Sequence, residues 1–419
     1  MAHGFSHAWR ALRHRNFQLF FAGQSISVLG SWMTRIATSW LVYHLTQSAL
    51  LLGVVGFAGQ IVSFLLGPFA GVWVDRLERR KLLLWTQIAA TAHALILAWL
   101  TMTHAITLWQ IIVLTSVQGL INAFDTPARQ VFLSQLIEEP QDLGNAIALN
   151  SSMMNAARLL GPAIGGALIA AAGEGWCFLI DGISYFAVIA SLMAVRVKAL
   201  PARQGKAGML SQMREGWDYV NGSRALRSIL LLFALVSLMG YPYIVLMPVI
   251  AGSVLHGGAH TLGLLMTASG AGGLISAVSL TLRKSARGLP GMMQAAPLML
   301  GAALILFGLS HNFWLSLVLL GVAGFGLIQT AAVANTIIQT LSEADKRARV
   351  MSYYTMAFYG AAPLGSLLAG LLADRIGAPL TIVVTGVCCL VGALWFAGEI
   401  GAIKTTLTVR DAHDKLVTT

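Results

Sequence analysis

The sequence Gly71-Val72-Trp73-Val74-Asp75-Arg76-Leu77-Glu78-Arg79-Arg80-Lys81 decides how this chain folds. It places six charged residues within seven positions, and long apolar stretches at 49–74 and 82–103 flank them. Apolar helices of about 20 residues cross a bilayer, and basic loops stay on its cytoplasmic side. We therefore expect a short cytoplasmic loop between two transmembrane helices.

The composition of the whole chain agrees with that expectation. Of the 419 residues, 57% are hydrophobic and only 10% are charged, and the mean hydropathy is +0.75. A soluble domain carries about 25% charged residues. Apolar windows recur at 17–45, 49–74, 82–103, 108–136, 144–172, 176–195, 226–252, 261–282, 290–309, 313–340, 350–373 and 379–398. The sequence predicts an all-α polytopic membrane protein with twelve transmembrane helices.

The net charge of +11 raises the question of a nucleic-acid partner, and its distribution answers it. Of the 27 Lys and Arg residues, 23 fall in segments that alternation assigns to one side of the membrane. That asymmetry follows the positive-inside rule and puts both termini in the cytoplasm. The basic segment 7–16 precedes an apolar run too long for a secretory signal, so we expect a retained first helix. No nucleic-acid partner is expected.

One extended polar region, 197–225, divides six windows from six. We predict a six-helix bundle over 1–196, a cytoplasmic linker over 197–225, a second six-helix bundle over 226–398 and a cytoplasmic tail over 399–419. Within the linker, apolar residues recur at helical spacing, as in a helix lying in the membrane interface. They are Met209, Leu210, Met213, Trp217 and Val220.

An internal repeat supports two related halves. The segment around Gly161-Pro162 has a counterpart around Ala362-Pro363, and aligning the two prolines superposes the fifth window on the eleventh. Parallel repeats of this kind occur in transporters that bind substrate near the bilayer midplane.

The loop itself carries a family resemblance. Gly71, Asp75-Arg76 and Arg79-Arg80-Lys81 resemble the signature loop between helices 2 and 3 of the major facilitator superfamily, with Glu78 where that pattern usually has a second Gly. The resemblance implies two pseudo-symmetric six-helix bundles that alternate access to a central cavity. We predict a conformational switch at the cytoplasmic side made of Gly71, Asp75, Arg76, Arg79, Arg80 and Arg349.

Longer segments resemble one bacterial branch of this superfamily. The stretches 17–84, 122–130 and 348–352 are similar to the branch that contains the enterobactin exporter and macrolide-efflux proteins. That resemblance implies a proton-coupled exporter of a siderophore or drug in the bacterial inner membrane. Thr115 stands where the fourth-helix motif of the superfamily normally has an Arg, so proton coupling must involve other residues.

The fifth window carries Gly161-Pro162-Ala-Ile-Gly165-Gly166, which resembles the antiporter motif of exporters. Small residues let helices approach closely, and Pro162 removes a backbone donor. We predict tight packing against the eighth window, where residues 269–273 are also small. The alternative is that these residues only pack helices, as small residues do in most membrane bundles.

Charged residues inside the windows are expensive and are usually functional or paired. They are Arg35, Asp125, Arg129, Arg158 and Asp181. At about 1.5 Å per residue, Asp125 and Arg158 reach a similar depth near mid-membrane. We predict that Asp125 is the proton-coupling carboxylate, tuned by Arg158 and Arg35; a permanent structural ion pair is the alternative. Asp181 is expected to cap or pack at an interface.

Polar and aromatic residues inside the windows predict an amphipathic substrate cavity. The candidates are Gln24, Trp32, Asn122, Tyr241, Tyr354 and Phe358. Tyr and Trp also anchor helices at membrane interfaces, which is the competing interpretation.

No catalytic or nucleotide-binding motif occurs, and Cys177, Cys388 and Cys389 lack metal-ligand spacing. We expect no enzyme activity, no cofactor and no metal. The expected partners are a small-molecule substrate, protons and membrane lipid, with the chain a monomer. A lipid flippase, a solute importer and a membrane sensor or scaffold without transport are the alternative functions.

Overall fold

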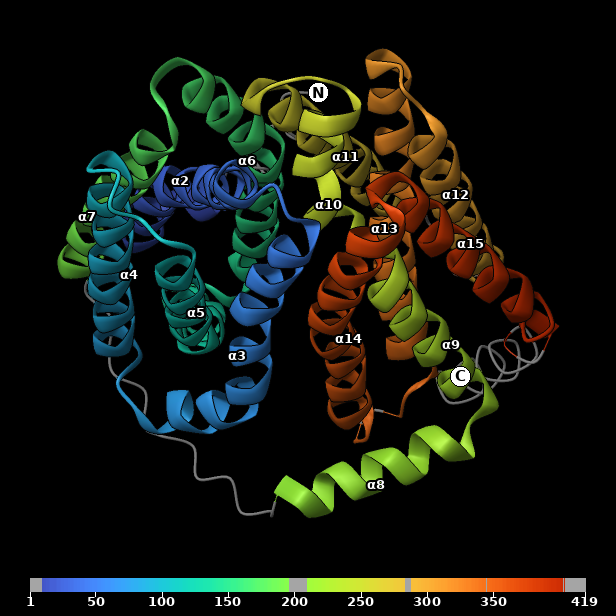
Figure 1. Cartoon of the computed structure of the whole chain (residues 1–419). Helices are drawn as coiled ribbons and strands as arrows, with labels where there is room; N and C mark the ends of the chain where they lie inside the picture. The colour runs from blue at the N-terminus through green and yellow to red at the C-terminus, as the bar shows by residue number, and fades with distance from the viewer. Residues whose placement is uncertain (1–9, 196–208, 283–287, 344, 402, 404–419) are drawn as a thin grey trace, which may run out of the picture. The chain divides into compact units, whose positions relative to one another are not determined.

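The computed structural model describes residues 10–195, 209–282, 288–343, 345–401 and 403. Within these ranges the chain is almost entirely helical and contains no strand, as expected. The helices gather into two compact units (Figure 1). Unit 1 consists of Met1–Gln47, Ala58–Gly205 and His256–Thr267, and unit 2 consists of Ser48–Phe57, Lys206–Leu255 and Ala268–Thr419.

Unit 1 is built from five complete long helices and parts of two others. The complete helices are α2 (Arg15–Thr46), α4 (Arg79–Met102), α5 (Leu108–Gln135), α6 (Leu143–Ala172) and α7 (Glu174–Ala194), with the short 3-10 helices η1 (Arg10–Arg13) and η2 (Pro140–Asp142). Helix α7 packs along α2 and α4, and α6 packs along α2. Buried apolar side chains at these contacts form its core.

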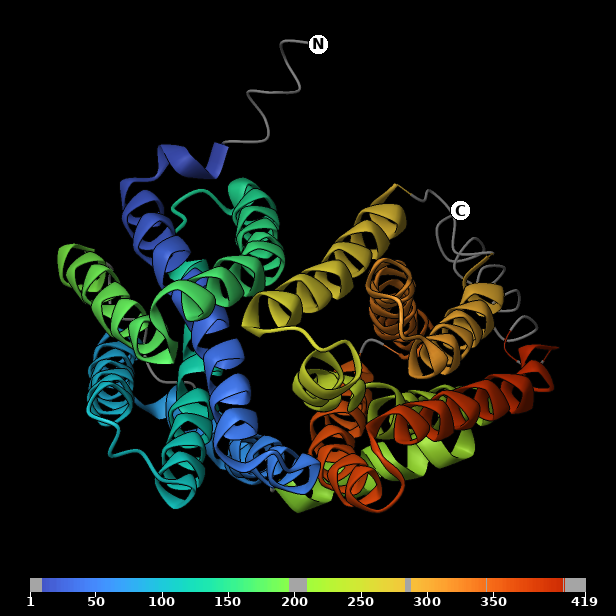
Figure 2. The same ribbon diagram turned by 45° about the horizontal axis from the view of Figure 1, so that its top comes forward.

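Unit 2 contains the remaining helices. They are α8 (Met209–Gly222), α9 (Arg224–Leu235), η3 (Val236–Gly240), α10 (Tyr243–Val249), η4 (Ile250–Val254), α12 (Leu289–Leu309), α13 (Phe313–Leu341), α14 (Arg347–Ile376) and α15 (Ala378–Ala397). Helix α12 lies against α13 and α15, visible as the orange and red helices of Figure 2. The linker helix α8 contacts α14 and α9.

Two helices have residues in both units: α3 (Ala49–Arg76) and α11 (Ala259–Thr281). The first residues of α3 pack in unit 2, where a Cβ added to Gly53 would lie 3.0 Å from the Cα of Gly370. The first residues of α11 pack in unit 1 beside Gly166. Glycine at these positions allows the backbones of paired helices to touch.

Ten of the described helices are long and apolar enough to cross a membrane. Helices α2 and α5 have 32 and 28 residues but fall outside that set, because polar side chains such as Gln24 and Asn122 lower their hydropathy. A multi-pass membrane protein is confirmed, while the number twelve stays a prediction. The predicted domain bounds also stay a prediction, and much of the linker and tail lies outside the described residues.

The seventh window is an interrupted helix. Residues 224–254 run from α9 through the π-helical turns η3 and η4, which flank α10. Pro242 and Pro248 fall in this region, and proline removes a backbone donor and disfavours regular α-helix. Hydropathy alone gave no sign of this interruption.

The fifth and eleventh windows end alike, which agrees with the internal repeat. Helix α6 is followed by Gly173 at φ 89°, and α14 by Gly377 at φ 83°. Each glycine also immediately precedes the next helix, as the N-cap residue of α7 or α15. A positive φ favours glycine at such a sharp reversal between helices.

Candidate functional site

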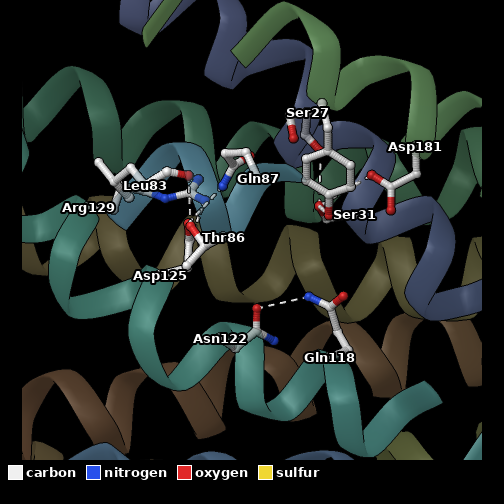
Figure 3. A network of polar contacts seen from close by, with 11 residues as sticks. Ser27, Ser31, Leu83, Thr86, Gln87, Gln118, Asn122, Asp125, Arg129 and Asp181 are labelled. Carbon is white, nitrogen blue, oxygen red and sulfur yellow. Dashed lines mark hydrogen bonds and ion pairs between the residues drawn. The ribbon is translucent and has the colours of Figure 1, made fainter. Parts of the chain in front are cut away.

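A buried polar network centred on Asp125 lies between α4 and α5 in unit 1 (Figure 3). Asp125 is 6% exposed. Its carboxylate accepts hydrogen bonds from the Thr86 hydroxyl at 2.9 Å and from the Gln87 amide at 2.7 Å. It also forms an ion pair with Arg129. Two helices therefore supply one cation and two neutral donors to a single carboxylate.

The sequence spacing explains this arrangement. Arg129 follows Asp125 by four residues, which places the two side chains one helical turn apart on α5. Thr86 and Gln87 are adjacent on α4, and α4 packs directly against α5. An ionised carboxylate buried among apolar helices needs such partners, because an unpaired charge there is very costly.

The predicted partners of Asp125 lie elsewhere. The guanidinium carbon of Arg35 lies 4.7 Å from the centre of the Trp32 ring, and that of Arg158 lies 5.9 Å from it. The structure thus differs from the predicted Asp125–Arg158–Arg35 network, because Arg129 is nearer along the same helix. A role for Asp125 in proton coupling stays a prediction.

Asp181 lies at the interface of α7 with α2 and is 2% exposed. The Ser31 hydroxyl donates to its carboxylate at 3.5 Å and lies 3.2 Å from the Tyr185 hydroxyl. A Cβ added to Gly30 would lie 2.7 Å from the carboxylate. Asp181 is thus packed between two helices, as expected, and Figure 3 shows it beside Ser31.

The signature loop joins α3 to α4, and its basic residues have different contacts. Arg80 donates to the carbonyl oxygens of Leu192 at 2.7 Å and Met193 at 2.9 Å, at the end of α7. Lys81 pairs with Glu78 at 2.7 Å. Arg76 is exposed and Arg79 is half-buried, and Gly71 has open space where a Cβ would stand.

The predicted switch as a whole stays a prediction. The side chain of Asp75 lies outside the described residues. Arg349, at the start of α14, pairs with Glu215 of α8 within unit 2. Next to this pair, the rings of Trp217 and Tyr353 lie 5.9 Å apart. The side chains of 209–213, which include three residues of the predicted interfacial face, also lie outside the described part.

The residues of the antiporter motif pack on two helices. Added Cβ atoms at Gly161 and Gly165 would meet Trp32 and Met33 of α2, and one at Gly166 would lie 2.7 Å from the carbonyl oxygen of Ala259 in α11. The carbonyl oxygen of Pro162 faces Gly263 of the same helix. The fifth and eighth windows therefore pack through small residues.

Part of the predicted partner surface on the eighth window packs elsewhere. Added Cβ atoms at Gly272 and Gly273 would meet Gly321 and Ile328 of α13, so these two glycines pack on α13. The contacts with the fifth window described by the structure come earlier in α11, at Gly263 and at Thr267, whose hydroxyl donates to the carbonyl oxygen of Leu159 at 3.2 Å. Sequence spacing alone does not say which face of a helix meets which neighbour.

The predicted cavity residues fall into two groups. In unit 1, Gln24 is buried, and the Asn122 side-chain oxygen accepts a hydrogen bond from the Gln118 amide at 3.0 Å. The Trp32 ring contacts the guanidinium groups of Arg35 and Arg158. In unit 2, Tyr354 stacks on Phe233 with ring centres 4.6 Å apart, and Phe358 contacts both Phe233 and Tyr241. With Tyr359, whose ring centre lies 5.2 Å from that of Phe358, they form an aromatic cluster of five rings among the described residues.

Sequence reasoning missed several members of these sites. Thr86 and Gln87 were not among the candidates. Their polar side chains within the apolar third window could have marked them as partners of a charge in the fourth window. Arg129 was noted as a charge, and its spacing of four from Asp125 could have identified the pair. Phe233 carried no signal, because a single Phe in an apolar helix is ordinary.

Comparisons with known proteins identify the family of the chain. Residues 6–414 match the family described as "Transmembrane secretion effector". The staphyloferrin A transporter of Staphylococcus aureus is 27% identical over 381 residues, covering 90% of this chain and 95% of that protein. Macrolide efflux protein A of Streptococcus pyogenes is 24% identical over 367 residues, covering 86% of this chain and 90% of that protein.

Solved structures show the same fold. A bacterial homologue of the human lysosomal transporter Spinster, in an inward-facing conformation, matches with a TM-score of 0.68 at 16% identity, covering 94% of this chain and 98% of that one. The family match spans nearly all of the chain, and its relatives are transporters and not enzymes. The chain belongs to the transmembrane secretion effectors, a family of major facilitator superfamily transporters.

Proposed function

We propose that this protein is a proton-coupled exporter that moves an amphipathic small molecule, of the drug or siderophore class, out of the bacterial cytoplasm by alternating access. The observation that carries this proposal is the buried Asp125 network in a chain of this family. The relatives named for staphyloferrin A transport and macrolide efflux support the substrate class. The protein resides in the inner membrane with both termini in the cytoplasm and acts as a monomer surrounded by lipid.

Asp125 is the coupling carboxylate in this proposal, with Arg129 as its partner. Protonation neutralises the carboxylate, removes the ion pair with Arg129 and weakens the bonds from Thr86 and Gln87. The contact between α4 and α5 therefore has a different free energy in the protonated and the ionised states. A proton taken up on one side and released on the other then biases which conformation is stable.

The signature loop supplies the conformational switch in this proposal. Asp75, Arg76 and Arg79 stabilise the outward-facing state by binding the cytoplasmic start of α14, where Arg349 lies. Of these three residues, only the Asp75 carboxylate has the charge to pair with Arg349, which forms an ion pair with Glu215 of α8. Arg80 is occupied by the end of α7 and serves to fix the loop within unit 1.

A lipid flippase and a solute importer are the competing functions on the same fold. Direction and substrate class separate them from the exporter. A membrane sensor or scaffold without transport would show no solute flux at all.

The test uses everted membrane vesicles from bacteria that overproduce the full chain, with ethidium and a fluorescent lysolipid as probes. An interior acidified by respiration drives exporters in these vesicles to accumulate substrate. We expect ethidium accumulation that nigericin abolishes and that control vesicles with empty vector lack. Lysolipid transfer without ethidium accumulation would favour the flippase, and accumulation only in right-side-out vesicles would favour the importer. Either result would contradict the export proposal.

A further inference from the structure

Two cations from different helices share one aromatic ring in unit 1. Trp32 and Arg35 lie on α2, and Arg158 lies on α6, which packs along α2. The guanidinium carbons lie 4.7 and 5.9 Å from the centre of the Trp32 ring. Trp32 and Arg158 are half-buried, and Arg35 is exposed. Like charges gathered at one ring repel each other, so the arrangement needs an explanation.

The described carboxylates of unit 1 do not neutralise these two cations. Asp125 pairs with Arg129, Asp142 pairs with Arg10 and His14, and Asp181 accepts from hydroxyl groups. Four further acidic side chains of unit 1 are described at or near helix ends: Glu78 contacts Lys81, Glu174 contacts His44, Glu139 accepts from Gln141, and Glu138 is exposed. Among the residues that the structure describes, Arg35 and Arg158 therefore have an aromatic partner and no anionic one.

Both cations lie far from the ends of their helices. Arg158 is the sixteenth of 30 residues in α6, about 20 Å from either end at the rise of an α-helix. Arg35 is eleven residues before the end of α2, about 16 Å away. A charge at this depth is expensive and is normally compensated by a partner or a ligand.

The hydrogen-bond donors of Arg35 and Arg158 have no partner among the residues that the structure describes. A cation–π contact leaves the N–H groups of a guanidinium able to bind a carboxylate in bidentate fashion. Trp32 is held in place, since it packs on Val28, Met153 and Ala157 and lies directly against Gly161. The ring is thus a fixed platform for two donors.

Neutral polar groups extend the site along α6. Ser151 and Asn155 precede Arg158 by seven and three residues and share its face of the helix. Ser151 is exposed and Asn155 is half-buried, so this face offers two neutral polar groups beside the apolar Met154.

We propose that Trp32, Arg35 and Arg158 form a binding site for an organic anion, in which a carboxylate binds the two guanidinium groups and an adjacent planar group lies against Trp32. The inference rests on the proposed export function, because it names one substrate class, organic anions, that the exporter accepts at this site; the cation ethidium tests the transport function and not this site. It also gives Arg35 and Arg158 a role separate from proton coupling.

Binding of a matched pair of probes tests the site. Naphthalene-2-carboxylate and the uncharged naphthalene-2-carboxamide share size and ring, and calorimetry on the purified full chain compares their Kd values. We expect the carboxylate to bind at least tenfold more tightly than the carboxamide, with an affinity that falls as salt rises. Inorganic phosphate serves as a third probe and should compete weakly, because it lacks the planar group.

Variants then assign the binding to these residues. Arg35→Gln and Arg158→Gln should each weaken carboxylate binding at least tenfold and leave carboxamide binding unchanged, and Trp32→Leu should weaken both. Arg158→Lys keeps the positive charge but lacks the planar guanidinium, so its affinity for the carboxylate should lie between those of wild type and Arg158→Gln. Such partial recovery would show that the loss in Arg158→Gln is not caused by misfolding. Arg375→Gln, an exposed cation at the end of α14, is the control and should bind as wild type. Equal binding of both probes, or wild-type carboxylate binding by the two Gln variants, would overturn the proposal.

The vesicle transport assay distinguishes failure of this inference from failure of the export proposal. If ethidium is exported but the carboxylate does not bind, the anion site is wrong and the export function stands. If the carboxylate binds through Arg35 and Arg158 but no probe is transported, the site stands and the export function is wrong.

Discussion

Asp125 and Arg129 form an ion pair across one turn of α5, and the Asp125 side chain is 9% exposed while that of Arg129 is 18% exposed. The pair lies within a helix whose other buried residues are apolar, such as Ile121, Ala123 and Ala128. A pair of this kind stabilises little when complete, but removal of one partner leaves an uncompensated charge. The two residues should therefore depend on each other strongly.

Removal of the cation alone should be more harmful than removal of both charges. We expect Arg129→Gln to lower the unfolding free energy by about 3 kcal/mol, because it strands the Asp125 carboxylate. The double change Asp125→Asn with Arg129→Gln should recover most of that loss. Thermal unfolding of the purified variants measures the coupling. Additive effects of the two changes would show that the pair is not formed in the membrane.

The contact between α6 and α11 should be intolerant of any side chain. A Cβ at Gly166 would lie 2.7 Å from the carbonyl oxygen of Ala259 and 2.9 Å from the Cα of Gly263. We expect Gly166→Ala to destabilise by about 1–3 kcal/mol and to slow transport. Gly144, on the same helix, has no neighbour within 4 Å of such an atom and supplies the control.

Gly144→Ala should leave transport unchanged and stabilise slightly, by about 0.5–1 kcal/mol, since it removes backbone entropy from the unfolded chain. Thermal unfolding and vesicle transport of both variants give the comparison. Equal effects at the two glycines would show that close packing is not the reason for Gly166.

Arg80 should hold the end of α7. The last carbonyl groups of a helix lack backbone partners, and a cation there also interacts favourably with the helix dipole. We expect Arg80→Gln to lower stability by about 1 kcal/mol and to speed amide exchange at residues 190–195. Lys81→Gln is the matched control, because the Lys81 side chain is 72% exposed and contacts only Glu78 among the described residues. Faster exchange in the control would argue against the assignment.

The fold could be predicted from hydropathy and charge because membrane helices must satisfy every backbone group internally. An apolar window of the right length therefore has few structures to adopt other than a membrane helix. The Gly71–Lys81 loop then indicated the major facilitator superfamily among the families of membrane proteins. The interrupted seventh window escaped prediction because π-helical turns depend on local packing around Pro242 and Pro248.

The site was predictable only residue by residue. Asp125 is distinctive because ionisable groups are rare in apolar helices, yet its partners depend on rotation of each helix about its axis. The similar depth of Arg158 in the membrane suggested it as the partner of Asp125. The structure shows instead that Asp125 pairs with Arg129, one turn along α5. For the same reason, sequence alone did not show that Gly272 and Gly273 of α11 pack on α13 while Gly263 packs on α6.

Coupling at Asp125 is the central claim, and reconstituted transport tests it most directly. The purified chain in liposomes, with an imposed pH gradient, is assayed for substrate accumulation together with proton movement reported by an internal pH dye. We expect Asp125→Asn to abolish both uphill accumulation and substrate-driven proton flux, yet to retain downhill exchange. Asp374→Asn, at an exposed carboxylate of α14, should behave as wild type. If Asp125→Asn still concentrates substrate against its gradient with wild-type proton flux, Asp125 does not couple transport to protons.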